Sequence, residues 1–103
     1  MTRPIFKRPQ AERDIEECFV YIAEENLDIG ISFLVAVEDS LEQLSRMPLI
    51  GRVKAFKNMN GLTLRIWPVK RFEAYLLFYL ADDDSVELVR LLHGSRDIDG
   101  LFG

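Results

Sequence analysis

Residues Asp84–Asp99, with the sequence DSVELVRLLHGSRDID, contain the strand around which we expect the fold to be built. Val86–Leu92 is rich in β-branched and aliphatic residues and lies between three aspartates and Gly94, a pattern typical of a strand. Strict alternation would place Val86, Leu88, Arg90 and Leu92 on one face, and Glu87, Val89, Leu91 and His93 on the other. Apolar residues on both faces predict a central strand that is covered on both sides.

Two amphipathic helices are predicted before this strand. Ile5–Lys7 reads as a short first strand, and Pro9 suits the first turn of a helix. Apolar residues at helical spacing define one face of each helix: Ala11, Ile15, Cys18, Phe19 and Ile22, then Phe33, Leu34, Val37, Leu41 and Leu44. We expect Asn26 to end the first helix in a left-handed cap, Asp28 to cap the second, and Pro48 to end it. So short a link predicts an antiparallel helical hairpin. Cys18 is predicted to be a packing residue of this hairpin.

A three-stranded antiparallel meander is predicted after the helices. Residues 49–61 read as a basic loop, with Lys54 and Lys57 on either side of Phe56. Leu62–Trp67, closed by Pro68, and Phe72–Leu80 alternate as strands, and the aspartates at 82–84 turn the chain into the strand at Val86. We expect the core to contain Leu64, Ile66, Leu76 and Phe78, facing the helices, with Phe19, Ile22, Val37 and Leu41. The other face would then gather Arg65, Trp67, Tyr75 and Tyr79 as an open aromatic and cationic surface.

The predicted architecture is therefore α+β, with one domain over residues 1–103. Hydrophobic residues make up 49% and charged residues 29% of the chain, which is an ordinary globular composition. The single Cys18 forms no internal disulfide, and no apolar run approaches the ~20 residues that span a membrane. We expect a cytoplasmic protein that makes no contact with membranes.

The net charge of −4 divides unevenly along the chain. Residues 10–46 hold ten acidic and two basic side chains, whereas residues 49–81 hold six basic side chains and one acidic one. This asymmetry predicts an acidic solvated surface and a basic working surface. The chain alone is not expected to bind duplex DNA, because its net charge is negative and its helices are acidic.

Few residues are candidates for chemistry. There is no CxxC or paired histidine spacing for a metal, and no GxGxxG or P-loop for a nucleotide cofactor, so neither is expected. The remaining candidates are Arg65, the turn His93–Arg96, and the Lys54–Lys57 loop, each suited to a phosphate or an acidic peptide. His93 has the chemistry of a general acid or base near neutral pH, although a lone histidine at a strand end is more often structural.

The ordered set of motifs resembles the RelE/ParE toxin superfamily, and its ParE-type branch in particular. The matching segments are Ala11–Ile15, Tyr21–Glu24, the helix from Phe33 onward, Pro48–Arg52, Leu64–Arg65, Phe72–Tyr75, Phe78–Tyr79 and, most specific, Arg90–Ile98. The resemblance implies the toxin of a type II toxin–antitoxin system, of the kind associated with plasmid stabilisation. It also implies a ParD-like antitoxin in a hetero-oligomer and DNA gyrase as the target.

On this interpretation the target would bind Arg65, Trp67, Tyr75, Arg90, His93, Arg96, Leu101 and Phe102, and the antitoxin would bind Arg52, Lys54, Lys57 and Tyr79. The alternative is the RelE-like branch, which cleaves messenger RNA on the ribosome and would use His93, Arg96 and Arg65 catalytically. The sequence departs from that branch, since Tyr75 stands roughly where it would place a strand arginine and no tyrosine follows Arg96. A non-toxic member that only binds is a third possibility. We therefore expect a gyrase inhibitor that is not an enzyme.

Overall fold

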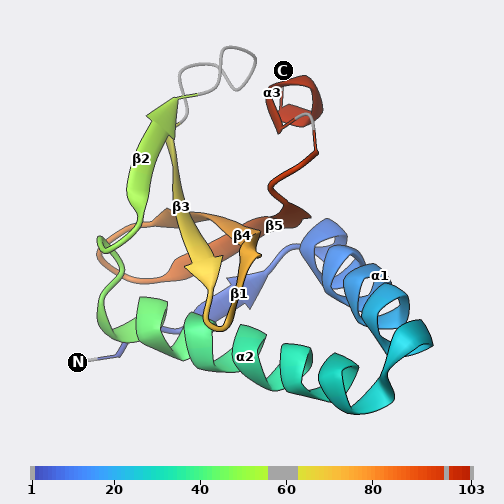
Figure 1. Cartoon of the computed structure of the whole chain (residues 1–103). Coiled ribbons are helices and arrows are strands. Elements are labelled where there is room, and N and C mark those ends of the chain that lie inside the picture. Colours follow the sequence, from blue (N-terminus) through green and yellow to red (C-terminus); the bar gives the residue numbers. More distant parts are fainter. Residues whose placement is uncertain (1, 56–62, 97, 103) are drawn as a thin grey trace.

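The computed structural model describes residues 2–55, 63–96 and 98–102 and has the predicted α+β architecture (Figure 1). The elements in chain order are β1 (Ile5–Lys7), α1 (Pro9–Glu25), α2 (Leu27–Arg46), β2 (Arg52–Ala55), β3 (Thr63–Val69), β4 (Phe72–Ala81), β5 (Val86–His93) and α3 (Ile98–Phe102). The sheet order is β1-β5-β4-β3-β2, in which β1 runs parallel to β5 and every other pair is antiparallel. The prediction that Val86–Leu92 forms an inner strand is confirmed, because β5 lies between β1 and β4.

The helical hairpin forms as predicted, but its link is tighter than expected. α1 begins at Pro9, and a single residue, Asn26, separates it from α2. Asn26 is extended (φ −156°) rather than left-handed, and its side chain accepts a hydrogen bond from the Ile29 N–H at 3.1 Å. Asn26 is therefore the N-cap of α2 in place of Asp28, which lies inside the first turn. Gly30 permits the close approach of the helices, because a Cβ there would lie 2.9 Å from the Ala23 Cβ.

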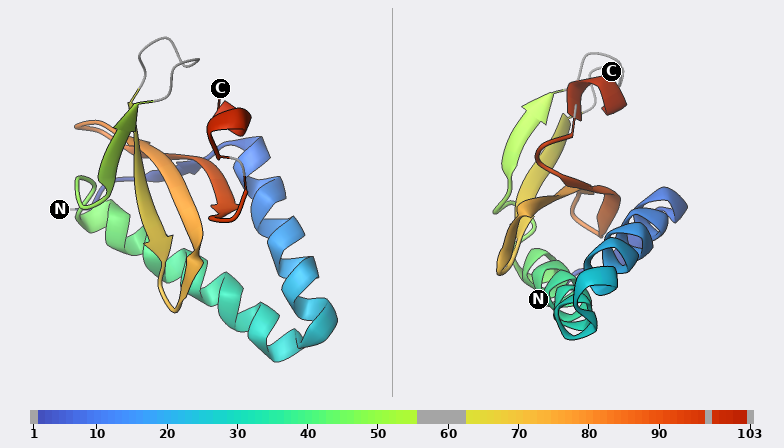
Figure 2. Two further views of the ribbon diagram at one scale, coloured as in Figure 1. Left: turned by 45° about the horizontal axis from the view of Figure 1, so that its top comes forward. Right: turned by 45° about the vertical axis from the view of Figure 1, so that its right-hand side comes forward.

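The face of the sheet that the helices cover is the opposite of the predicted one. Both long helices lie beside the same face of the sheet (Figure 2, right). The buried cluster that includes the helix residues contains Leu77 and Tyr79, with Trp67 and Tyr75 packed against it. A second cluster contains Leu64, Ile66, Phe78, Val89 and Leu92, with Leu76, Leu80 and Ile98 packed against it. The prediction that Arg65, Trp67, Tyr75 and Tyr79 form an open surface is therefore wrong, because the helices cover this face of the sheet.

The physical reason is that both faces of the meander are apolar enough to be buried, and Trp and Tyr bury their rings when their polar atoms find partners. The Tyr79 hydroxyl and the Trp67 indole both have internal hydrogen-bond partners. The predicted core residues Leu64, Ile66, Phe78, Val37 and Leu41 are buried, and Leu76, Phe19 and Ile22 are partly buried. The prediction that these residues belong to the core was thus correct, but the prediction of which face of the sheet packs against the helices was wrong.

A β-bulge explains why alternation fails along β5. Phe78 pairs with Arg90 and Tyr79 with Leu88, so Val89 is an extra residue on β5. On the N-terminal side of the bulge Leu88 belongs to the helix-facing cluster, and on its C-terminal side Leu91 does. Val89 and Leu92 face the other way. A single inserted residue therefore reverses the predicted faces of the second half of the strand.

Two further predictions for the chain between α2 and β4 were wrong. Part of the predicted basic loop is the edge strand β2, which pairs with β3 from Arg52↔Ile66 to Ala55↔Thr63. All four of its residues are exposed, and the alternation of Arg52 and Lys54 with Val53 and Ala55 was too short to distinguish a strand from a basic loop. Pro68 does not end β3, which continues to Val69 through a register shift, a position where proline is tolerated. The predicted turn at 58–61 lies outside the described residues.

Candidate functional site

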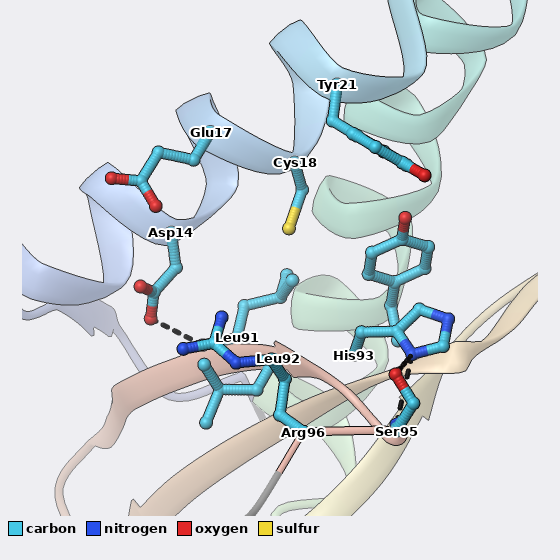
Figure 3. Close-up of a pocket in the computed structure, with 10 residues that line it drawn as sticks. Asp14, Glu17, Cys18, Tyr21, Leu91, Leu92, His93, Ser95 and Arg96 are labelled. Atoms are coloured by element: carbon cyan, nitrogen blue, oxygen red, sulfur yellow. Dashed lines mark hydrogen bonds between the residues drawn. The ribbon is translucent and has the colours of Figure 1, made fainter. Parts of the chain in front are cut away.

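A cleft of about 440 Å³ opens between α1 and the C-terminal end of β5 (Figure 3). Figure 3 shows that side chains of α1 face those of β5 and of the turn that follows it. The lining residues are Asp14, Glu17, Cys18 and Tyr21 from α1, Tyr75 from β4, and Leu91, Leu92, His93, Ser95 and Arg96. The cleft thus unites three of the predicted target-binding residues, Tyr75, His93 and Arg96.

Asp14 fixes α1 against β5 at one end of the cleft. Its carboxylate, which is only 4% exposed, accepts hydrogen bonds from Arg90 Nε at 2.7 Å and Arg90 Nη2 at 3.1 Å. It also accepts from the Leu91 backbone N–H and from Gln10 Nε2, each at 3.1 Å. The paired geometry is the bidentate arrangement that suits a guanidinium and a carboxylate. Arg90 is therefore held between α1 and the sheet.

Aromatic rings make the opposite wall of the cleft. The Tyr75 ring meets the His93 ring edge-to-face at 5.0 Å and the Phe33 ring of α2 at 5.1 Å. The Ser95 backbone N–H donates to His93 Nδ1 at 3.0 Å, so Nδ1 is the acceptor and Nε2 carries the proton in the neutral ring. Burial raises the pKa of the Tyr75 hydroxyl, and the neighbouring Cys18 and Tyr21 add to this effect. The Tyr75 hydroxyl is consequently protonated and neutral at physiological pH.

Cys18 is partly buried on the floor of the cleft, in agreement with its predicted packing role. Burial is the main cause that raises the pKa of its thiol from 9.0 to about 11, and Asp14 and Glu17 raise it further against the opposing effect of Arg96. The thiol is therefore protonated at neutral pH and is a poor nucleophile.

We accordingly expect slow alkylation of Cys18 in the folded protein. At neutral pH the rate with iodoacetamide should be on the order of 100-fold lower than in the urea-unfolded chain, because two pKa units remove that much thiolate. The folded rate should rise with pH until the thiol ionises near pH 11. Mass spectrometry of timed aliquots measures both rates, and equal rates in the two states would contradict the shift.

Besides Arg90, three residues of the predicted binding sites make internal contacts. Arg65 Nη1 donates to the carbonyl oxygens of Leu49 at 3.2 Å and Gly51 at 2.9 Å. Trp67 Nε1 donates to Gln43 Oε1 of α2 at 3.1 Å. Tyr79 is 0% exposed, so the antitoxin has no access to it in this fold. Its burial follows from the inverted face of the sheet.

The predicted antitoxin-binding residues Arg52 and Lys54 lie on the exposed edge strand β2. Lys57 lies outside the described residues, as does the side chain of Phe102. Leu101 of α3 is 39% exposed. The predicted residues therefore occupy separate places: the cleft, the β2 edge, the C-terminal helix and the interior.

Sequence reasoning missed the contribution of α1 to the cleft. Asp14, Glu17, Cys18 and Tyr21 have the spacing i, i+3, i+4 and i+7, which places them on one stripe of the helix. That stripe borders the predicted apolar face, and the mixture of acidic, thiol and phenol groups along it was the available signal. These side chains form a cleft only because the C-terminal end of β5 lies opposite α1, and the spacing of residues along one helix does not reveal that neighbour.

The described residues also bear on two other classes of site. Among residues 2–55, 63–96 and 98–102, no group of three or more His, Cys, Asp or Glu side chains is placed to hold a metal ion. Within the same residues, no helix has the length and apolarity needed to cross a membrane.

The fold consists of a short strand, a helical hairpin and an antiparallel meander, and the first strand pairs in parallel with the last strand of the meander. This arrangement is that of a small α+β toxin domain of the RelE/ParE type. The family model for the ParE toxin of type II toxin-antitoxin system, parDE, matches residues 5–98, and the chain belongs to this family. The predicted resemblance is thus confirmed, and membership implies an antitoxin partner. A comparison with curated proteins found no match.

Proposed function

We propose that this toxin inhibits DNA gyrase by binding to it, without a catalytic step of its own. The observation that carries the proposal is the placement of Arg65 and Arg90. Arg65 is bound to two backbone carbonyl groups, and Arg90 is bound to Asp14. A ribonuclease needs such cations free to stabilise the charged transition state. Tyr75, His93 and Arg96 remain at the cleft, where they suit protein recognition.

His93 provides a sharp test of this proposal. Asparagine at position 93 places a side-chain oxygen where it can accept from the N–H two residues later, as Nδ1 does now. The turn is therefore retained while the acid–base group is removed. If the protein only binds gyrase, we expect His93→Asn to weaken the inhibition of supercoiling by less than about tenfold, as for the loss of one contact at an interface. A ribonuclease would lose on the order of 100- to 10,000-fold in rate.

Two assays read the outcome. One follows supercoiling by purified gyrase, and the other follows the integrity of ribosome-bound message during translation. Inhibited supercoiling with intact message supports the proposal. Cleaved message with normal supercoiling contradicts it and favours the ribonuclease alternative, and inhibition in neither assay would indicate a member that only binds its antitoxin.

We further propose that a ParD-like antitoxin neutralises the toxin by adding an acidic extended or amphipathic segment at β2. Among the described residues β2 is the last strand of the sheet, so an extended segment can add to its outer edge, where Arg52 and Lys54 carry complementary charge. Arg52→Glu should weaken antitoxin binding about tenfold at low salt, and less at high salt. The control Lys70→Glu makes the same change in net charge at the β3–β4 turn. Equal losses in the two variants, measured by calorimetry, would contradict a local contact.

The isolated toxin is proposed not to bind duplex DNA, so operator binding would belong to the antitoxin. The net charge is −4, and nine of the ten acidic side chains of residues 10–46 are exposed, Asp14 being buried. Fluorescence anisotropy with labelled duplex, repeated over a range of salt concentrations, tests this. Salt-sensitive binding by the isolated chain would overturn it.

A further inference from the structure

The cleft beside β5 continues onto the outer face of α1. A second depression of about 420 Å³ lies on that face and is lined by Arg13, Glu16, Val20 and Glu24, together with Glu17 and Tyr21. Glu17 and Tyr21 line the first cleft as well. The two depressions therefore lie on either side of these two side chains, and we call the surface that they form together the α1 groove.

Tyr21 is the large exposed side chain of the α1 groove. It is 69% exposed, whereas Tyr75, across the cleft, is fixed by edge contacts with Phe33 and His93. Val20, 47% exposed, extends the apolar surface along the helix. A partner side chain that enters the cleft would be enclosed by the exposed Tyr21 phenol on one side and the Tyr75 ring on the other. Buried aromatic anchors of this kind contribute most to protein interfaces.

The charges of the α1 groove indicate what kind of partner fits. Among the described residues that line it, four carry carboxylates, Asp14, Glu16, Glu17 and Glu24, and two are cations, Arg13 and Arg96. The Asp14 carboxylate is neutralised by Arg90, but Glu17 is exposed at the junction of the two depressions. Carboxylates repel the phosphates of nucleic acid and attract lysine or arginine. The groove is therefore better suited to a protein with a basic residue beside an apolar one.

We propose that the target protein docks across α1, with an apolar side chain seated in the cleft against Tyr21 and a basic side chain paired with Glu17. The proposal rests on the function proposed above, inhibition by protein binding. It adds two recognition residues that lie outside the predicted target-binding set. Glu17 acts in it as a specificity determinant, because a target with an acidic residue at that place would be repelled.

The test measures the affinity of four variants for gyrase by calorimetry. We expect Tyr21→Ala to weaken binding about 30-fold, as for a central aromatic anchor, and Glu17→Lys to weaken it about tenfold, with a loss that shrinks as salt is added. Leu27→Ala is the matched control for Tyr21→Ala, because Leu27 is 58% exposed and lies on α2. Glu25→Lys is the matched control for Glu17→Lys, because Glu25 is exposed on α1 outside both depressions. Both should bind gyrase within about twofold of wild type, and all four should bind the antitoxin normally.

The outcomes separate this proposal from the gyrase assignment. If wild type binds gyrase and the groove variants bind it equally well, the docking surface is wrong and the target is right. If wild type does not bind gyrase, the gyrase assignment fails, and growth arrest on expression becomes the readout for the same variants. Relief of arrest by Tyr21→Ala and Glu17→Lys, but not by the controls, then supports the docking surface, and equal arrest overturns it. Stronger action by Glu17→Lys would also overturn it, because an added cation favours nucleic acid.

Discussion

Replacing Asp14 with alanine is expected to lower the free energy of unfolding by about 3 kcal/mol or more. The change leaves the Arg90 guanidinium, with a side chain only 19% exposed, without its carboxylate. It also removes the acceptor of the Leu91 N–H and of Gln10 Nε2. Breaking a buried pair in this way costs more than the pair contributes, because the remaining charge stays poorly solvated. Urea denaturation of the purified protein measures the loss.

Two further variants make this prediction specific. Arg46→Ala removes an exposed ion pair with Glu42 one helical turn away and should cost under about 0.5 kcal/mol. The double variant Asp14→Leu/Arg90→Met removes both charges and should recover the part of the loss that comes from the unpaired guanidinium, while the Leu91 N–H still lacks its acceptor. If Asp14→Ala cost no more than Arg46→Ala, the pair would not hold α1 against β5.

Apart from β2 and α3, the order of the elements was predictable because periodic apolar patterns and punctuation by Pro, Gly and Asp are local. Pro9 begins α1, and the hydrophobic spacing from Phe33 to Leu44 marks the buried face of α2. The side of the sheet to which the hairpin packs was not predictable on that basis. Leu64 and Ile66 on one face, and Leu77 and the Tyr79 ring on the other, are all suited to burial, so either face satisfies the alternation. The bulge at Val89 is a tertiary feature as well, since it depends on the partner strand.

The candidate site, like the fold, was only partly predictable from the sequence. Tyr75, His93 and Arg96 were predicted as target-binding residues, and the structure brings them together at one cleft. Arg65 and Trp67 were chosen for their chemistry, but chemistry alone does not distinguish a binding arginine from one that holds its own loop. That distinction depends on where Leu49, Gly51 and Gln43 lie in space.

Deleting one hydroxyl, in Tyr79→Phe, is expected to lower the free energy of unfolding by about 2 to 3 kcal/mol. The Tyr79 hydroxyl donates to the Pro48 carbonyl at 2.8 Å and accepts from the Gly51 N–H at 2.9 Å. Pro48, Gly51 and Tyr79 are all buried, so the change leaves two backbone groups without a partner, at about 1 kcal/mol or more each. The control Tyr21→Phe deletes the same atom from an exposed ring and should cost under about 0.5 kcal/mol.

Alkaline pH gives an independent test of the same contact. Burial raises the pKa of Tyr79 above its ordinary value of 10.0, against smaller opposing effects of the Gly51 N–H and Arg65. Because the folded pKa is the higher one, the stability from neutral Tyr79 is complete below pH 10 and is lost as the pH rises through the folded pKa. Wild type should therefore lose stability more steeply above pH 10 than Tyr79→Phe does.

The contact also bears on the antitoxin. Tyr79 and Arg65 together fix the segment 48–51 that leads directly into β2, and a Cβ at Gly51 would lie 2.6 Å from the Tyr79 oxygen. We therefore expect Tyr79→Phe to weaken antitoxin binding at β2 severalfold, although the antitoxin does not touch this residue. Tyr79 would then be a positioning residue. Calorimetry with the antitoxin measures the affinity of the Tyr79→Phe variant. If that affinity were unchanged while stability fell as expected, residues 48–51 would position β2 without the hydroxyl, and Tyr79 would contribute to stability alone.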